Sequence, residues 1–489
     1  LFITGSVTLF SQRSLVGLLL GPVLFMLVLL MPLPEGMSPQ GLSVAAIAVL
    51  MAVWWVTEAI PIPATALLPI VLFPVMGVLS GSEVTHAYGN HLIYLFLGGF
   101  LIAVTMEKWN LHHRIALHTI RLVGLTPQGI VLGFMLATAF LSMWISNTAT
   151  TMMMVTIAMA VITEKQLDDI QTSARLDFGG VLMLGIAYAA SLGGVATLIG
   201  TPPNAIFAGV IEKTYGISIS FLDWMVFALP MSVVMLALCW LYLTRIVFAR
   251  ADLQLPGSQS VIREQIERLG DMTRQEKQVA VVFCTVAALW VLRGLYQPEA
   301  LAMVKDSTIA IAGALLLFMI PVDISKGEFL LDWKTAVRVP WDIIILFGGG
   351  FALAQGFGES GLTLWLAEQL SILDGSSMIL IILAVVSLVV FLTEMTSNTA
   401  TASLLLPVMG ALATAIDMNP LGLMVASVLA ASFAFMLPVA TPPNAIVFST
   451  RLIGITQMAR TGFWMNLIGV VVITGFVYLV LPLAWGITL

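Results

Sequence analysis

The sequence predicts an all-α polytopic membrane protein built as an inverted repeat, and three observations carry that prediction. Sixty per cent of the 489 residues are apolar, only 9% are charged and the mean hydropathy is +1.04, whereas a soluble domain carries roughly 25% charged residues. The pentapeptide SNTAT occurs twice, at 146–150 and 397–401, and each copy is followed by TPPNA, at 201–205 and 441–445. All four copies lie in apolar segments, where polar side chains and prolines are costly unless they line a cavity.

Apolar runs long enough to cross a bilayer occur along the whole chain. Spans are predicted near 15–32, 41–57, 62–80, 90–107, 178–212, 221–248, 278–295, 306–321, 341–358, 421–450 and 462–487. Arg13 and the apolar run after it resemble a signal peptide, but no small-residue cleavage site follows, so we interpret the run as a first spanning helix. The stretch 108–124 is amphipathic, and the charged segment 249–278 is expected to form a short solvated helix between two halves.

The positions of Lys and Arg predict how these segments cross the membrane. We place the N-terminus in the cytoplasm and let segments 128–163 and 378–415 each return to the side from which they enter. All but three of the 20 Lys and Arg then lie on the cytoplasmic side, the exceptions being Lys213, Arg293 and Lys305. Both segments are therefore predicted to be re-entrant helical hairpins with SNTAT at the tip.

The two halves align at a constant offset. LFLGGFLIA at 95–103 aligns with LFGGGFALA at 346–354, and the same offset aligns Ser146 with Ser397. An odd number of crossings separates the hairpins, so the second hairpin enters from the opposite face and the C-terminus lies outside. Paired interruptions in an inverted repeat indicate a transport site near the midplane.

The SNTAT tips offer groups for both cations and anions. Backbone N–H groups at helix starts favour anions, and carbonyls at helix ends favour cations. Ser and Thr hydroxyls and the Asn amide both donate and accept hydrogen bonds, so the tips can coordinate Na⁺ and hold a carboxylate. The alternative is that these small polar residues only hold helices together; two copies at one offset favour the site.

The TPPN motifs predict broken helices. Pro202 and Pro203 lack N–H groups, so the carbonyls of Leu198 and Ile199 are expected to lose their helical partners. The second motif repeats this relation at Pro438, Val439, Pro442 and Pro443. Because 178–212 is too long for one straight span, a break is expected there, and an ordinary proline kink is the alternative.

Charged residues are rare near these motifs. Glu394, four residues before Asn398, either acts in the site or holds the base of the hairpin through a hydrogen bond. Neither motif contains Arg or Lys, and the closest candidates, Lys165 and Arg451, are predicted toward the membrane edge. A nucleotide-binding loop and a nucleophile–base arrangement are both absent from the sequence, which favours gradient-driven transport over an enzyme.

These residues resemble the divalent anion/sodium symporter (DASS) family of INDY-like transporters over nearly the whole chain. Besides the SNT motifs, the resemblance rests on WWVTEAIP at 54–61, EKWNLH at 107–112 and SFAFMLPVATPPN at 432–444. It implies a homodimer with about 11 transmembrane helices and two re-entrant hairpins per protomer, in which a transport domain moves against a scaffold domain as an elevator. The expected division is scaffold 1–127, transport 128–250, cytoplasmic linker 251–277, scaffold 278–377 and transport 378–489.

The resemblance also implies the binding residues. A first sodium site would use Ser142, Ser146, Asn147 and the carbonyl of Gly200. A second would use Thr393, Thr396, Ser397, Asn398 and the carbonyl of Ala440, with Thr396 contributing mainly its backbone. The substrate carboxylates would meet Asn147, Thr148, Asn398 and Thr399, and the pocket would be completed by Thr201, Thr441 and Pro442.

The expected activity is sodium-coupled symport of C4-dicarboxylates such as succinate, malate and fumarate. Na⁺ is the expected coupling ion, and the expected partners are the dicarboxylate, the lipid bilayer and a second copy of the chain, without an organic cofactor or nucleic acid. The chain is expected in a bacterial inner membrane as a multi-pass protein with a cytoplasmic N-terminus. A sodium-independent dicarboxylate exchanger and an anion channel remain the alternatives.

Overall fold

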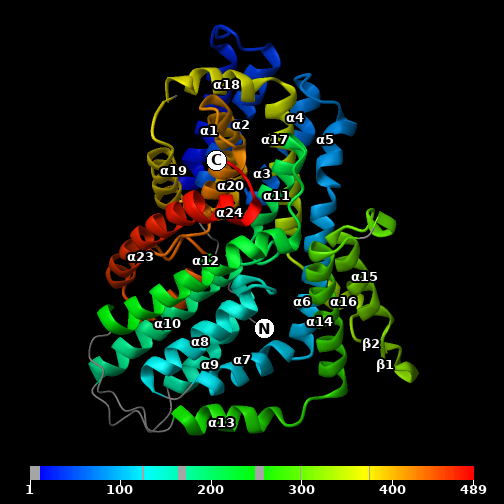
Figure 1. The fold of residues 1–489 in the computed structure, drawn as a ribbon, viewed down its shortest axis with the longest axis vertical. Helices are drawn as coiled ribbons and strands as arrows, with labels where there is room; N and C mark the ends of the chain where they lie inside the picture. Colours follow the sequence, from blue (N-terminus) through cyan, green and yellow to red (C-terminus); the bar gives the residue numbers. More distant parts are fainter. Residues whose placement is uncertain (1–11, 124–125, 163–171, 248–257, 298, 374) are drawn as a thin grey trace.

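The computed structural model describes residues 12–123, 126–162, 172–247, 258–297, 299–373 and 375–489. Over these residues the chain is almost entirely helical (Figure 1), so the predicted all-α membrane architecture is confirmed. Nine helices in the described residues are long and apolar enough to cross a membrane, and shorter apolar helices accompany them. Breaks within several predicted spans produce these shorter helices. Lys165 and linker residues 251–257 lie outside the described residues.

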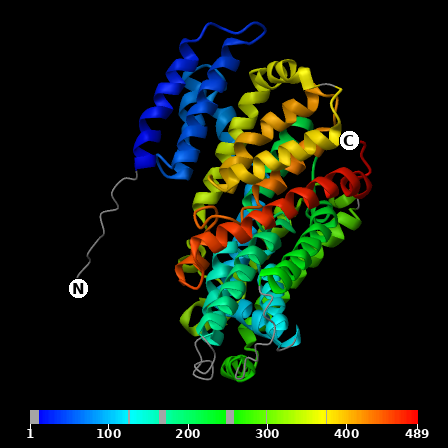
Figure 2. The same ribbon diagram turned by 90° about the vertical axis from the view of Figure 1, so that its left-hand side faces the viewer.

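The chain begins with an antiparallel helix pair followed by short helices, namely α1 (Gln12–Leu30), α2 (Pro39–Thr57), α3 (Ile62–Thr65), α4 (Leu68–Val75) and α5 (Gly81–Tyr88). Figure 2 shows α1 and α2 standing at one side of the molecule. The prediction of a single span at 62–80 is wrong. Pro69, which has no N–H to donate, lies in the first turn of α4, and Gly77 leaves the helix with a φ of +66°.

The first repeat contains α6 (His91–Lys108), α7 (Leu111–Val123), α8 (Pro127–Ser142), α9 (Asn147–Ile162), α10 (Thr172–Val195), α11 (Pro202–Tyr215) and α12 (Phe221–Tyr242). Helices α8 and α9 form the predicted hairpin with SNTAT at its tip. Helix α10 ends at Val195, well before the prolines. The prolines therefore begin α11 and do not kink a continuous helix, because a helix start needs no N–H from its first residues.

The second repeat contains α17 (Trp341–Glu359), α18 (Leu362–Leu370), α19 (Met378–Thr393), α20 (Asn398–Ala415), α21 (Pro420–Ala431), α22 (Pro442–Ser449), α23 (Ile455–Gly475) and α24 (Leu481–Trp485). Helices α19 and α20 form its hairpin. Helix α19 ends at Thr393 and α20 begins at Asn398, the equivalents of Ser142 and Asn147 in the first repeat. Helix α7 follows α6, and α18 follows α17, the equivalent of α6 in the second repeat. Helices α7 and α18 nevertheless lie at opposite ends of the molecule (Figure 1), as an inverted repeat requires.

The repeats are joined through α13 (Ser258–Leu269), α14 (Arg274–Leu295), α15 (Asp306–Met319), the antiparallel strands β1 (Pro321–Asp323) and β2 (Glu328–Phe329), and α16 (Trp333–Ala336). Helix α14 begins earlier than the expected residue 278 because Thr273 and Glu276 form a capping box at its start. One-turn 3₁₀ or π segments complete the described structure at Leu243–Val247, Glu299–Leu301, Ile324–Lys326, Ser371–Leu373 and Phe476–Val480.

Equivalent packing organises the interior of both repeats. The first helix of each hairpin lies against the next long helix, α8 against α10 and α19 against α21. The segment Phe178–Val195 is completely buried in the structure, whereas most of α1 is exposed. Both hairpin tips are therefore supported from behind by helices that the protein itself covers.

Candidate functional site

Both hairpin tips and both helix breaks border one cavity of about 550 Å³. The predicted site residues that line it are Ser146, Asn147, Thr148, Gly200, Thr201, Thr396, Ser397, Asn398, Thr399, Ala440, Thr441 and Pro442. The remaining two, Ser142 and Thr393, lie directly behind the tips and are fully buried. Four motifs that are far apart in the sequence are thus brought together around one space.

Four helices begin at this cavity. Helices α9 and α20 start at Asn147 and Asn398, and α11 and α22 start at Pro202 and Pro442. In α9 the first intrahelical bond runs from Thr150 N–H to the Ser146 carbonyl at 3.0 Å. In α20 the equivalent bond runs from Thr401 N–H to the Ser397 carbonyl at 2.9 Å. Each helix start carries about half a positive elementary charge. These helix starts direct partial positive charge into the cavity although its motifs contain no Arg or Lys.

Oxygen atoms gather behind the first tip. The Ser142 hydroxyl donates to the Ala190 carbonyl at 2.8 Å and contacts the Asn147 side-chain amide. If the amide is turned so that Nδ2 faces this cluster, Nδ2 donates to the carbonyls of Gly200 at 3.3 Å and Ala190 at 3.2 Å. With Oδ1 facing the cluster, four oxygens of the kind that coordinate Na⁺ converge there.

The second tip repeats the arrangement. The Thr393 hydroxyl lies 2.7 Å from Asn398 Oδ1 and donates to the Ala431 carbonyl at 2.9 Å. One difference between the repeats concerns a predicted sodium ligand. Thr396 bonds its hydroxyl to Thr401 at 2.6 Å and to the Leu392 carbonyl at 3.1 Å, whereas Ile145 takes its place in the first repeat. These bonds of the Thr396 side chain are to its own hairpin.

Comparison with known proteins shows which family the chain belongs to. The family described as the sodium:sulfate symporter transmembrane region matches residues 12–489. The chain belongs to the sodium:sulfate symporter family. The predicted resemblance to the DASS transporters is thereby confirmed, and the chain is a multi-pass membrane protein of a transporter family.

Relatives of this symporter-family chain include proteins named sodium-dependent dicarboxylate transporter SdcS. One, from Staphylococcus saprophyticus, is 47% identical over 484 residues, which are 98% of this chain and 93% of the relative. Another, from Staphylococcus aureus, is 47% identical over 486 residues, again covering 98% and 93%.

Two solved structures share the fold. The Alcanivorax borkumensis YdaH transporter has a TM-score of 0.54 and 12% identity, with 97% of each chain covered. The Neisseria gonorrhoeae MtrF protein has a TM-score of 0.56 and 12% identity, with 93% of this chain and 98% of that one covered. At this identity the likeness shows the fold of this chain alone.

The asparagines of the TPPN motifs, which the sequence analysis gave no role, hold the two helix breaks of this chain. Asn204 Nδ2 donates to the Thr197 carbonyl at 2.7 Å and to that of Val195 at 3.2 Å. Asn444 Nδ2 donates to the carbonyls of Ala434 and Leu437, both at 3.0 Å. Both asparagines are completely buried. Their repetition in both motifs was the available signal.

Glu394 holds the second hairpin against the loop after α21. Its Oε1 accepts from the N–H groups of Phe435 at 2.7 Å and Met436 at 2.9 Å, and its Oε2 accepts from Leu437 at 3.0 Å. Asn466 Nδ2 on α23 adds a fourth bond to Oε1 at 2.8 Å. Of the two interpretations of Glu394, the structure shows the hydrogen-bonding role at the hairpin base.

Sequence reasoning missed three charged residues at the cavity, Arg13, Glu58 and Asp342. Arg13 Nη2 donates to the carbonyl of Met395 beside the second tip at 2.7 Å and to the Val56 carbonyl. Among the described lining residues Arg13 is the cation, whereas Arg451 is exposed and does not line the cavity. The three stand at helix ends outside the SNTAT and TPPNA motifs, and the fold brings them to the site.

Proposed function

We propose that this chain is a secondary transporter that couples Na⁺ to the symport of C4-dicarboxylates such as succinate, malate and fumarate. One observation carries the proposal: a single cavity is bordered by four helix starts and backed by two matched oxygen clusters. The names of the relatives, sodium-dependent dicarboxylate transporters, support the same substrate class and coupling ion.

The cavity suits a small dianion. Four helix starts at about half a charge each supply about two positive charges, which matches the charge of a C4-dicarboxylate near neutral pH. Asn147 and Thr148 would bind one carboxylate, and Asn398 and Thr399 the other. Thr201, Thr441 and Pro442 would enclose the carbon atoms that join the two carboxylates of the substrate. At the wall Arg13 is accompanied by the acidic side chains of Glu58 and Asp342, so the helix starts would supply the compensation for the dianion.

The proposed sodium sites lie behind the carboxylate sites. The first comprises Ser142, Ser146, Asn147 and the Gly200 carbonyl; the second comprises Thr393, Thr396, Ser397, Asn398 and the Ala440 carbonyl. The carbonyls of Ala190 and Ala431 lie within hydrogen-bonding distance of the Ser142 and Thr393 hydroxyls and are available as further ligands.

The amide of Asn147 provides a physical route to coupling. When Na⁺ occupies the oxygen cluster, Oδ1 faces the ion and Nδ2 is left to donate to a carboxylate. Without the ion, the amide turns and Nδ2 donates to the Gly200 and Ala190 carbonyls, which presents an oxygen to the substrate. Sodium then strengthens dicarboxylate binding, and by reciprocity dicarboxylate strengthens sodium binding. At least two Na⁺ ions are expected with each dianion.

We further propose that the structure represents an inward-open state of an elevator. Arg13 lies in the first turn of α1, Glu58 follows α2 and Asp342 lies in the first turn of α17. The Lys and Arg distribution assigns all three helix ends to the cytoplasmic side. The scaffold and transport segments, the homodimer and the bacterial inner membrane remain part of this proposal, supported by membership of the family.

The test is the affinity for succinate, measured by calorimetry on purified protein across a series of Na⁺ concentrations at constant ionic strength. We expect succinate binding to tighten as Na⁺ replaces K⁺, and labelled succinate to accumulate in liposomes only with external Na⁺. An affinity that does not change with Na⁺ would reject the symporter and favour the sodium-independent exchanger. Non-saturable flux would favour a channel.

A further inference from the structure

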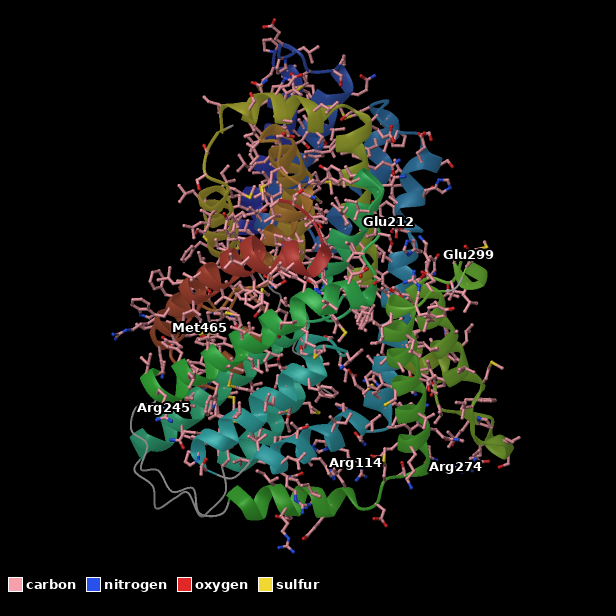
Figure 3. All side chains as sticks on the ribbon, viewed as in Figure 1. Arg114, Glu212, Arg245, Arg274, Glu299 and Met465 are labelled. Carbon is pink, nitrogen blue, oxygen red and sulfur yellow. The ribbon has the colours of Figure 1, made fainter. Side chains whose placement is uncertain are left out.

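A second polar network lies away from the cavity, at the end of α11. Glu212 Oε2 is 2.8 Å from Nε2 of His91, the first residue of α6. Glu212 Oε1 accepts from Lys305 Nζ, just before α15, at 3.0 Å. Glu212 therefore joins α11 to the starts of two other helices. Figure 3 shows it on the side of Glu299, far from Arg114 and Arg274.

Asp306, the residue after Lys305, binds the start of α12, which follows α11 after the connection at 216–220. Asp306 Oδ2 accepts from the N–H of Phe221, the first residue of α12, at 2.8 Å. Its Oδ1 accepts from Arg293 Nη1 on α14 at 2.9 Å, and only 6% of the residue is exposed. Lys305 and Asp306 thus bind both ends of the 216–220 connection between α11 and α12.

The partners fall on two sides of the proposed domain boundary. Helices α11 and α12 belong to the first transport segment, whereas α6, α14 and α15 belong to scaffold segments. Helix α15 packs against both α6 and α14, so His91, Lys305 and Asp306 stand on one supported surface. The charge distribution places Lys305 and Arg293 outside, opposite the ends that carry Arg13 and Asp342.

We propose that His91, Glu212, Phe221 N–H, Lys305 and Asp306, here called the outer clamp, form a latch that stabilises the inward-open state. This inference rests on the proposed alternating access. Sliding of packed elements past one another by about one helical turn, about 5.4 Å, breaks contacts of this length. The outer clamp must therefore open before the cavity can face outward, and its strength sets the balance between the two states.

The prediction is tested on the full chain in membrane vesicles with Glu212→Gln, Lys305→Glu and the charge-swapped pair Glu212→Lys with Lys305→Glu. The reporter is a cysteine at Val439, which lines the cavity and is 65% exposed. The native cysteines are replaced as Cys239→Ala and Cys284→Ser. An impermeant maleimide is applied from the cytoplasmic side and, in separate samples, from outside.

We expect Glu212→Gln to slow cytoplasmic labelling relative to labelling from outside by about threefold, because this ratio follows the equilibrium between the two states and a partly exposed ion pair supplies an effect of that size. Lys305→Glu should slow it similarly, and the swapped pair should restore most of the rate because it re-forms an ion pair in reverse order. The matched control is Glu299→Gln, which removes an exposed carboxylate before α15 and should leave labelling unchanged. Succinate binding affinity should change little in the swapped pair.

Labelling of Glu212→Gln at the wild-type rate would overturn the outer clamp, and so would slowing that the swapped pair does not reverse. If Glu212→Gln does not fold, judged by gel filtration, Lys305→Gln removes the same ion pair from the scaffold side and carries the same prediction. Failure of the proposed function is separate: it appears as wild-type succinate binding that ignores Na⁺, whatever the labelling rates are.

Discussion

Replacing Glu394 by Gln should destabilise the protein and weaken its second sodium site. The carboxylate accepts four N–H bonds, three on Oε1 and one on Oε2. The amide oxygen of Gln can replace Oε1, but its NH₂ group would then face the Leu437 N–H. One bond is lost and a buried donor is left without a partner, at a cost of about 1–3 kcal/mol. The other three change from charged to neutral bonds, each roughly 0.5–1 kcal/mol weaker.

The free energy of unfolding should therefore fall by roughly 2.5–6 kcal/mol, with a larger loss for Glu394→Ala, which removes all four bonds. The assay is the melting temperature of purified protein with and without Na⁺. The stabilisation by Na⁺ should also shrink, because Glu394 adjoins Thr393 and fixes the hairpin base.

The first repeat provides a matched control. Met143 occupies the position equivalent to Glu394, and Met143→Leu conserves volume and polarity, so it should cost less than about 1.5 kcal/mol. A Glu394→Gln protein that melts like the wild type and keeps its full response to Na⁺ would refute the reasoning that these four bonds support the hairpin.

Three further predictions concern the tips and one surface helix. Asn147→Ala and Asn398→Ala should each abolish succinate uptake while the protein stays folded, since each amide serves both an ion and a carboxylate; near-normal uptake by either would remove that asparagine from the site. A single cysteine in the tip at 397–399 should be labelled from outside and one at 146–148 from inside when both conformations are sampled; labelling of both from one side in every state would contradict the inverted repeat. Burial in α7 lowers the pKa of His112 to about 4, against about 6.5 when unfolded. Between these two pKa values the unfolded chain binds more protons than the folded protein. The free energy of unfolding is therefore kept above pH 6.5 and falls as the pH falls toward 4, by about 2 kcal/mol between pH 7 and pH 5. Melting temperatures across this range should show the loss in the exposed control His118→Gln and less of it in His112→Gln; equal slopes would contradict it.

The sequence by itself determined the features that depend on local pattern. Apolar runs fixed the helical membrane architecture, because backbone groups in lipid must be satisfied within helices. The SNTAT and TPPNA motifs located both hairpin tips and both breaks, and the residues they predicted surround one cavity. Position relative to a repeated motif is information that the chain carries directly.

Only the tertiary structure decided contacts between elements distant in the chain. Nothing near Glu394 in the sequence indicates the loop at 435–437 or Asn466, and nothing near Arg13 indicates Met395. The break after α3 and the pairing of Glu212 with His91 and Lys305 are of the same kind. A helix pattern specifies which residues share a face. Which partners that face meets is fixed only when all the helices pack together.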